Sequence, residues 1–193
     1  MSINDEKKLL RQEMMRRRAE MLPAARHAAD EAICRNVLEH PAFAAAKQVF
    51  AYVAMPHEVR TQELLAACLE AGKILALPVC DTNTHTMTFY RLDHMEELTE
   101  GAYRIPVPPV SPERICNAGC DTLMLLPMLA YDADGYRLGA GGGYYDRFLA
   151  THTDVKTIGL CYADCRAKSL PQDAYDKKMQ TLVTEKGTED FHG

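Results

Sequence analysis

The pattern of apolar and polar positions predicts a helix at the start of the chain. Ile3, Leu10, Met14 and Met21 recur at spacings of seven, four and seven residues. These spacings place the four side chains on one stripe, which is typical of an amphipathic helix over residues 4–21. Polar side chains fill most of the positions between them, so the opposite face of this helix is expected to meet water.

Proline positions and short apolar runs mark the next elements. Pro23 begins a second predicted helix, because proline suits the first turn of a helix but not its interior. This helix runs to about His40, where Pro41 ends it. An apolar run at residues 49–53 then predicts a short buried strand.

A strand–helix–strand unit follows from this point. Thr61 can cap a helix over residues 62–71, and Gly72 can close that helix. The apolar run at residues 73–78 predicts the next strand. Together with the strand at residues 49–53, this order and its short connections predict a parallel sheet.

The second half of the chain continues the sheet. Residues 87–92 alternate like a half-exposed strand, and residues 101–114 contain four prolines and are expected to form an extended surface loop. Residues 123–131 are the most apolar run, which predicts a central strand covered on both faces. Further strands are expected at residues 156–162 and 182–184.

Length and composition favour one α/β domain over residues 1–193, with a mostly parallel open sheet and helices on both faces. No apolar run is long enough to span a membrane, and the net charge of −5 argues against general nucleic-acid binding. Residues 1–27 carry seven basic and four acidic side chains, a net charge of +3, which leaves −8 for the remainder. A positively charged N-terminal segment on an otherwise acidic protein favours a small anionic ligand bound near that segment.

The seven cysteines do not form a convincing metal motif. Cys116 and Cys120, like Cys161 and Cys165, have neither the CxxC spacing nor a nearby histidine that a zinc site needs. The opening segment lacks the apolar core of a signal peptide and is too acidic for a transit peptide. We therefore expect a cytoplasmic protein with reduced thiols.

A glycine-rich loop follows the most apolar run. Four glycines lie within residues 139–143, Arg137 precedes them and Asp146 follows them. Glycines let backbone N–H groups turn toward a bound anion, an arginine forks onto phosphate oxygens, and a carboxylate can hold a divalent cation beside them. The spacing is neither GxGxxG nor a Walker A loop, so a tight connection without a ligand remains the alternative.

Cations near the N-terminus and polar segments after the strands point to the same edge of the sheet. Lys7 and Arg11 lie four residues apart on one helical face, with Arg18 seven further on. Such like charges repel unless an anion sits between them. The alternative is a solvated basic face, and this is the expectation for Arg16, Arg17 and Arg18. Glu58 and the loops that follow the later strands are expected to converge beyond the carboxyl ends of the strands.

Residues 137–147, RLGAGGGYYDR, resemble the signature of the 5-formyltetrahydrofolate cyclo-ligase (methenyltetrahydrofolate synthetase) family. The resemblance also covers residues 7–11 (KKLLR), residues 51–59 with Thr61, residues 73–78, and residues 170–171 with Asp176. Some members have basic or aromatic residues within the loop where this chain has Ala140 and Gly142. Phosphate contact here is therefore expected to depend more on backbone N–H groups and on the neighbouring cations.

The resemblance implies an α/β scaffold similar to those of sugar-phosphate isomerases and CoA transferases, and an ATP- and Mg²⁺-dependent ligase that closes 5-formyltetrahydrofolate to 5,10-methenyltetrahydrofolate. It implies catalytic roles for Lys7 and Arg137. The implied ATP-binding residues are Lys7, Lys8, Leu9, Leu10, Arg11, Arg137, Leu138, Gly139, Ala140, Gly141, Gly142, Gly143, Tyr144 and Tyr145. The implied folate-binding residues are Val53, Met55, Glu58, Ala140, Gly141, Gly142, Gly143 and Tyr144. The implied metal ligands are Asp146 and Asp176.

Simpler interpretations stand beside these roles. Glu58 can be an acid flanking a helix, Asp146 a helix cap and Asp176 a surface charge, while His57 in a loop is more often solvated than a base. Tyr144 and Tyr145 can stack on a ring or pack the loop. An isomerase on a similar scaffold and a non-catalytic folate- or nucleotide-binding protein are the competing functions. In each case we expect a monomer with small-molecule ligands, no nucleic acid and no membrane.

Overall fold

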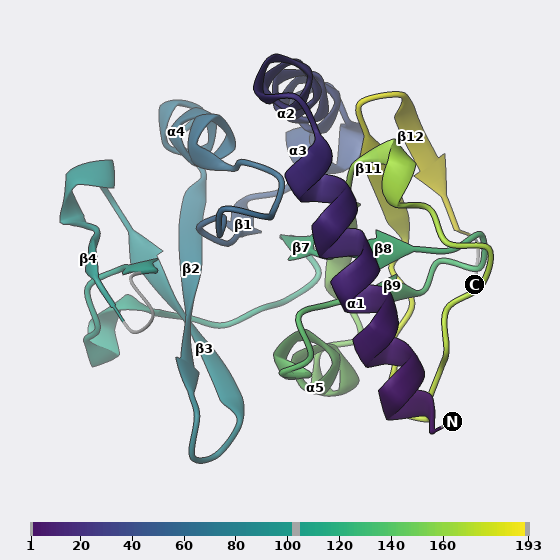
Figure 1. Cartoon of the computed structure of the whole chain (residues 1–193). Helices are drawn as coiled ribbons and strands as arrows, with labels where there is room; N and C mark the ends of the chain where they lie inside the picture. The colour runs from purple at the N-terminus through teal and green to yellow at the C-terminus, as the bar shows by residue number, and fades with distance from the viewer. Residues whose placement is uncertain (1, 102–104, 192–193) are drawn as a thin grey trace.

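The computed structural model describes residues 2–101 and 105–191, which build one large sheet with helices around it (Figure 1). The sheet has eight strands in the order β12-β11-β10-β7-β1-β2-β3-β6. These strands are β1 (Gln48–Phe50), β2 (Ile74–Asp81), β3 (Thr86–Leu92), β6 (Ile115–Cys116), β7 (Thr122–Pro127), β10 (Lys156–Leu160), β11 (Thr181–Thr184) and β12 (Gly187–Asp190). The five strands from β11 to β2 are parallel, and β12, β3 and β6 pair antiparallel at the two edges. The predicted mostly parallel α/β sheet is confirmed.

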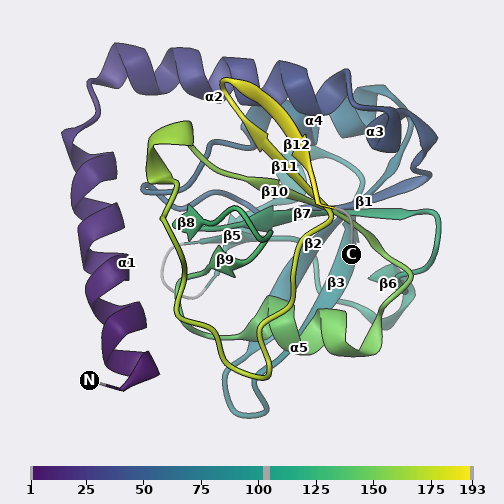
Figure 2. The same cartoon turned by 90° about the vertical axis from the view of Figure 1, so that its right-hand side faces the viewer.

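Helices lie on both faces of this sheet. In Figure 2, α2 (Pro23–Leu38), α3 (Pro41–Ala45) and α4 (Gln62–Glu70) lie on one side, and α5 (Tyr144–Thr151) lies on the other. The long helix α1 (Ile3–Glu20) crosses the edge where β7 and its parallel neighbours end. Among the described residues no helix combines the length and the apolar character needed to cross a bilayer.

β7 lies in the middle of the sheet, and its side chains are mostly apolar. Five of the six residues of β7 are buried, because neighbouring strands and both helical layers cover it. At Pro127 the chain leaves the sheet and forms a separate hairpin of β8 (Ala130–Tyr131) and β9 (Arg137–Leu138). The predicted single strand over residues 123–131 is therefore two strands, and the hairpin directs the glycine-rich loop toward α1.

Local signals set the helix ends, with two corrections. Ser2 and Asp5 form a capping box at the start of α1, and Gly72 closes α4 with a positive φ of 67°. Pro41 was expected only to end a helix, but it also starts α3, because its fixed φ suits a first turn. Thr61 precedes α4 without capping it, since its hydroxyl donates to the Tyr52 carbonyl at 2.7 Å.

Short elements connect the main strands. They are the turns Met95–Glu97, Pro112–Arg114 and Ala163–Cys165 and the two-residue strands β4 (Thr99–Glu100) and β5 (Pro106–Val107). The predicted loop at residues 101–114 thus contains a short strand and a turn, while residues 102–104 lie outside the described part. The predicted strands at 49–53, 73–78, 87–92, 156–162 and 182–184 are present with shifted ends, and β12 was not predicted.

Candidate active site

The glycine-rich loop is a tight turn between β9 and α5. Gly141 has a φ of 108°, and Gly143, with a φ of 66°, is the N-cap residue of α5. A Cβ atom on Gly142 would lie 2.7 Å from the Tyr144 ring, and one on Gly141 would lie 3.2 Å from the Arg11 guanidinium carbon. Side chains at these positions would strain the backbone or fill the loop, so glycine is required here for both conformation and space.

The N-terminal half of α1 packs directly against this loop. Arg11 Nε donates to the Gly139 carbonyl at 2.9 Å, and burial lowers the pKa of its guanidinium. Lys8 and Leu9 are exposed, and Leu10 packs against the core. Of the predicted segment at residues 7–11, the structure therefore brings Lys7 and Arg11 inward and leaves Lys8 and Leu9 on the outer face.

Lys7 is held by two carboxylates. Its Nζ lies 2.8 Å from Asp173 Oδ2 and 2.6 Å from Asp176 Oδ2, and only 7% of the residue is exposed. Burial disfavours the ammonium ion, but the two carboxylates outweigh this effect and raise the pKa of Lys7. Sequence analysis missed Asp173, although it lies three residues before Asp176 in the same loop.

Arg137 does not have a free fork for phosphate oxygens. Its Nη2 donates to Asp146 Oδ1 at 2.9 Å and its Nη1 to the Lys177 carbonyl at 2.6 Å, with 3% of the side chain exposed. The Lys177 amide also donates to Asp146 Oδ1, at 3.0 Å. Asp146 is therefore not a helix cap. It joins the glycine-rich loop to the segment that carries Asp176.

The two predicted metal ligands are thus brought to one side of the loop. Asp146 Oδ2 and Asp176 Oδ1 accept no hydrogen bond from any described residue, so each carboxylate keeps an oxygen for a ligand. No group of three or more histidine, cysteine or acidic side chains comes together in the described part of the chain. Two carboxylates with free oxygens fit Mg²⁺ beside phosphates, because this ion keeps several waters and binds phosphate oxygens.

The segment after β1 forms the other wall of the site. Glu58 is 7% exposed, its Oε2 accepts from the Met55 amide at 2.9 Å, and burial raises its pKa. Its carboxylate is therefore turned inward instead of flanking α4. Burial raises the pKa of Tyr145, and the Glu58 charge raises it further. Val53 and Met55 are half-buried.

Two residues without a predicted role fix the loop from outside. Arg147 donates to the Gly142 carbonyl and, through Nε at 2.9 Å, to the carbonyl of His85 in the β2–β3 turn. Its guanidinium also lies over the Tyr144 ring, 5.4 Å from the centroid. Tyr144 is therefore part of the packing of the loop. The motif at residues 137–147 contains Arg147, but its partner at His85 is distant in sequence.

Arg18 was expected on a solvated face, and this expectation is wrong. It is 2% exposed and donates to the carbonyls of His57, Met128 and Leu129 at 2.6–2.9 Å. The sequence did contain a signal, because Arg18 lies four residues after Met14 and continues the buried stripe of α1. By contrast, the exposed Arg16 and Arg17 pair with acids on the surface of α1.

Two thiols complete the surroundings of Arg18. Its guanidinium donates to the sulfurs of Cys161 and Cys165, at 3.2 and 3.4 Å. The hydrogen bond from Cys161 and the positive charge of Arg18 lower the pKa of the Cys165 thiol. Burial together with the arginine charges nearby lowers the pKa of His57, which favours its neutral imidazole. The C-terminal half of α1 is thus bound to both the segment after β1 and the chain that follows β7.

These features lie within a match to one known family. Residues 3–185 match the model of the 5-formyltetrahydrofolate cyclo-ligase family. The 5-formyltetrahydrofolate cyclo-ligase of Mus musculus is 29% identical, over 95% of this chain and 96% of the relative. The mitochondrial 5-formyltetrahydrofolate cyclo-ligase of Arabidopsis thaliana is 34% identical, over 96% of this chain and 76% of the relative. The structure of 5,10-methenyltetrahydrofolate synthetase from Aquifex aeolicus superposes with a TM-score of 0.79 at 30% identity, covering 97% of this chain and 93% of that one.

Proposed function

This chain belongs to the 5-formyltetrahydrofolate cyclo-ligase family, and from that premise we propose that its site closes 5-formyltetrahydrofolate to 5,10-methenyltetrahydrofolate with ATP as the second substrate. The observation that carries this proposal is the match over residues 3–185, which includes α1, the segment after β1 and the glycine-rich loop. The three meet at the carboxyl edge of the sheet, where α/β proteins of this kind bind ligands.

The chemistry requires activation of a poor electrophile. The formyl carbon at N5 is unreactive because its nitrogen donates electron density into the carbonyl group. Transfer of the γ-phosphoryl group to the formyl oxygen forms a P–O bond, releases ADP and gives an imidate-like phosphate. The folate nitrogen at position 10 then attacks this carbon, loses its proton, and the C–O bond breaks as phosphate leaves. The protein need only align two substrates and stabilise phosphate charge.

The glycine-rich loop and α1 supply the phosphate side of this task. The loop at residues 139–143 would offer its backbone N–H groups to phosphate oxygens, and Arg11 lies against this loop through the Gly139 carbonyl. Lys7 and Arg137 add positive charge. Since Arg137 already donates to Asp146 and Lys177, its role is to orient Asp146 and to stabilise phosphate charge at short range, without a bidentate contact.

Asp146 and Asp176 are the residues that would hold Mg²⁺, each through the oxygen that accepts no bond from a described residue. The ion would neutralise phosphate charge when bound. On the opposite wall, Val53 and Met55 give the folate an apolar surface, and Glu58 accepts N–H groups of the pterin. The half-buried position of Val53 and Met55 and the inward carboxylate of Glu58 support these assignments.

One assay tests the proposal. The methenyl product absorbs in the near ultraviolet and 5-formyltetrahydrofolate does not, so absorbance is followed with both substrates and Mg²⁺ present. We expect an increase that disappears when ATP or Mg²⁺ is omitted. Binding of 5-formyltetrahydrofolate without any increase would instead indicate a non-catalytic folate-binding protein. An isomerase would show neither turnover nor a requirement for nucleotide.

A further inference from the structure

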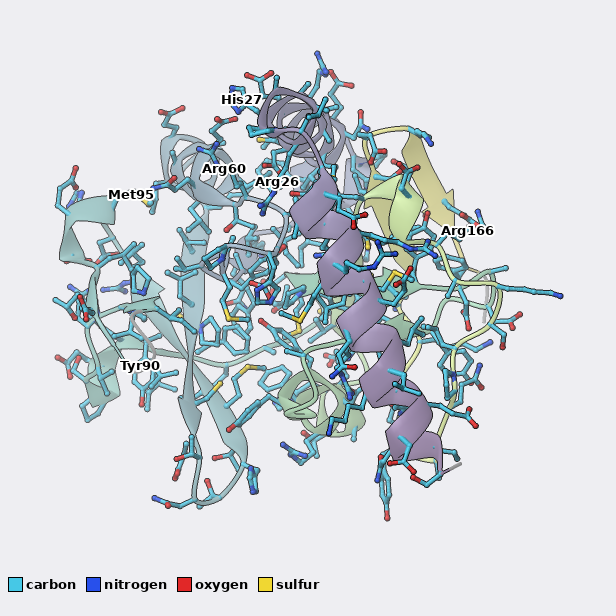
Figure 3. All side chains as sticks on the ribbon, in the orientation of Figure 1. Arg26, His27, Arg60, Tyr90, Met95 and Arg166 are labelled. Atoms are coloured by element: carbon cyan, nitrogen blue, oxygen red, sulfur yellow. The ribbon has the colours of Figure 1, made fainter. Side chains whose placement is uncertain are left out.

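A cavity of about 660 Å³ lies behind the segment that follows β1. It is lined by the end of α1, the first turns of α2, residues 53–56 and 60–62, and Met95, Leu98 and Pro106. In Figure 3 the labelled Arg26, His27 and Arg60 lie near its α2 side and Met95 lies across from them. Because Val53 and Met55 line this cavity, it adjoins the proposed folate contacts.

The cavity has an apolar wall and a cationic one. Its apolar surface comes from Met21, Val53, Met55, Leu65, Met95 and Leu98. Its cations are Arg18, Arg26 and Arg60, and within residues 2–101 and 105–191 none of the three forms an ion pair with a carboxylate. An uncompensated group of arginines beside an apolar wall favours an amphipathic anion.

Arg60 and Arg26 differ from Arg18 because each has guanidinium N–H groups without a hydrogen-bond partner among the described residues. The guanidinium of Arg60 makes one long contact, 3.5 Å to His27 Nδ1, and the residue is exposed. Arg26 uses Nε for the Tyr162 hydroxyl at 3.1 Å and Nη2 for the Glu58 carbonyl at 2.9 Å, which leaves Nη1 without a partner among the described residues. Arg18, by contrast, is fully engaged by carbonyls and thiols.

Asp30 positions two of these arginines. It lines the cavity, is 5% exposed, and its Oδ1 accepts from the Tyr162 hydroxyl at 2.6 Å and the Arg60 amide at 3.1 Å. Its Oδ2 is buried and has no hydrogen-bond partner in the described part of the chain. Because Oδ2 is covered by protein atoms, a ligand in the cavity does not reach it, and the role of Asp30 is to position Arg60 through its amide and Arg26 through the Tyr162 hydroxyl.

The apolar wall and the two arginines with free donors favour one class of ligand, which has an apolar body with carboxylates at one end. An N-acyl amino dicarboxylate has these features, and the aminobenzoyl-glutamate end of a folate is one. We propose that this cavity binds the glutamyl end of 5-formyltetrahydrofolate, with its carboxylates at Arg60 and Arg26 and its aminobenzoyl ring against the apolar wall. The inference rests on the proposed function, and it makes Arg60 a specificity residue for the folate substrate.

The test compares two substrates on two arginine variants. The first substrate is 5-formyltetrahydrofolate, and the second is its diamide, in which both glutamyl carboxylates are neutral. Arg60→Ala removes the exposed guanidinium of the cavity. Arg35→Ala is the matched control, because Arg35 is an exposed arginine of α2 that does not line the cavity.

Arg60→Ala should raise KM for 5-formyltetrahydrofolate about tenfold, as expected for a lost charged hydrogen bond, and leave kcat and KM for ATP unchanged. For the diamide, wild-type KM should already be raised, and Arg60→Ala should add little, because the two changes remove the same contact. Arg35→Ala should match wild type with both substrates. Wild-type turnover with a KM that Arg60→Ala leaves unchanged, or raises equally for both substrates, overturns the cavity assignment. Absence of product from wild type overturns the proposed function instead.

Discussion

The two ends of α1 carry positive charge in different ways. At its N-terminal end, Lys7 pairs with Asp173 and Asp176, and Arg137 beside it pairs with Asp146. At its C-terminal end, Arg18, Arg26 and Arg60 have no carboxylate partner among the described residues. The first region pairs its cations with carboxylates before any ligand binds, whereas the second has three arginines against the two carboxylates of Asp30 and Glu58, and none of these forms an ion pair in the described part of the chain.

This difference suits the ligands proposed for each end. ATP arrives with a divalent cation, so a region with both carboxylates and cations can bind the pair with little net change in charge. A folate tail carries carboxylates without a metal, so a region with unpaired arginines suits it better. The comparison therefore predicts that the N-terminal end depends on Mg²⁺ and backbone geometry, while the C-terminal end depends on arginine side chains.

The largest expected effect comes from replacing Arg18 at the C-terminal end of α1. Arg18→Met should destabilise the fold by about 3–5 kcal/mol, because it leaves buried carbonyls without their donor. Arg17→Met is the matched control, since Arg17 is exposed and should change stability by no more than about 0.5 kcal/mol. Urea denaturation of both variants measures this. Equal stabilities would mean that Arg18 does not anchor α1.

The next effect concerns backbone geometry at the N-terminal end. Gly142→Ala should lower kcat/KM on the order of 100-fold, because the added methyl group would meet the Tyr144 ring and displace the loop. Gly119→Ala adds the same methyl group where the nearest atom is 3.9 Å away, and it should behave like wild type. The cyclisation assay and a melting curve compare both. Near wild-type turnover of Gly142→Ala would reduce the loop to a connector.

A third effect tests the metal. Asp176→Asn should raise the Mg²⁺ concentration for half-maximal activity about tenfold, because a neutral amide is a poorer ligand for this ion. Asp173→Asn is the matched control, since Asp173 contacts Lys7 in the same way but is not a proposed ligand. Only Asp176→Asn should shift the titration. If both variants shift it equally, the effect comes from releasing Lys7, and Asp176 has no role in metal binding.

Sequence reasoning recovered one end of α1 better than the other, for physical reasons. Glycines, prolines and apolar runs are local signals, so the glycine-rich loop and the parallel sheet were predictable, whereas the hairpin before the loop was not. The partners of Arg18 lie 39, 110 and 143 positions away in the chain, and no local pattern indicates them. Asp30 likewise becomes unusual only when folding buries Oδ2 without a donor. The ion pair between Arg137 and Asp146 was missed because the motif led us to assign Arg137 to a phosphate and Asp146 to a metal.

The smallest effect concerns Glu58, whose carbonyl accepts from Arg26 and whose carboxylate accepts from the Met55 amide. Burial raises its pKa above the ordinary value of 4.5, so the folded state favours the protonated form. The stability gained in this way is present below pH 4.5 and is lost as pH rises through the folded pKa. At neutral pH the ionised carboxylate therefore weakens the unliganded fold.

Glu58→Gln imitates the protonated carboxyl group and should stabilise the unliganded protein at pH 8 by on the order of 1 kcal/mol. This gain should shrink toward zero below pH 4.5, where wild type is protonated too. The same variant should raise KM for the folate about tenfold, because the charged acceptor for pterin N–H groups is lost. Glu39→Gln, an exposed acid at the end of α2, should show neither change. Denaturation curves at pH 4 and pH 8 decide the question, since a gain equal at both pH values would come from packing and not from the buried charge.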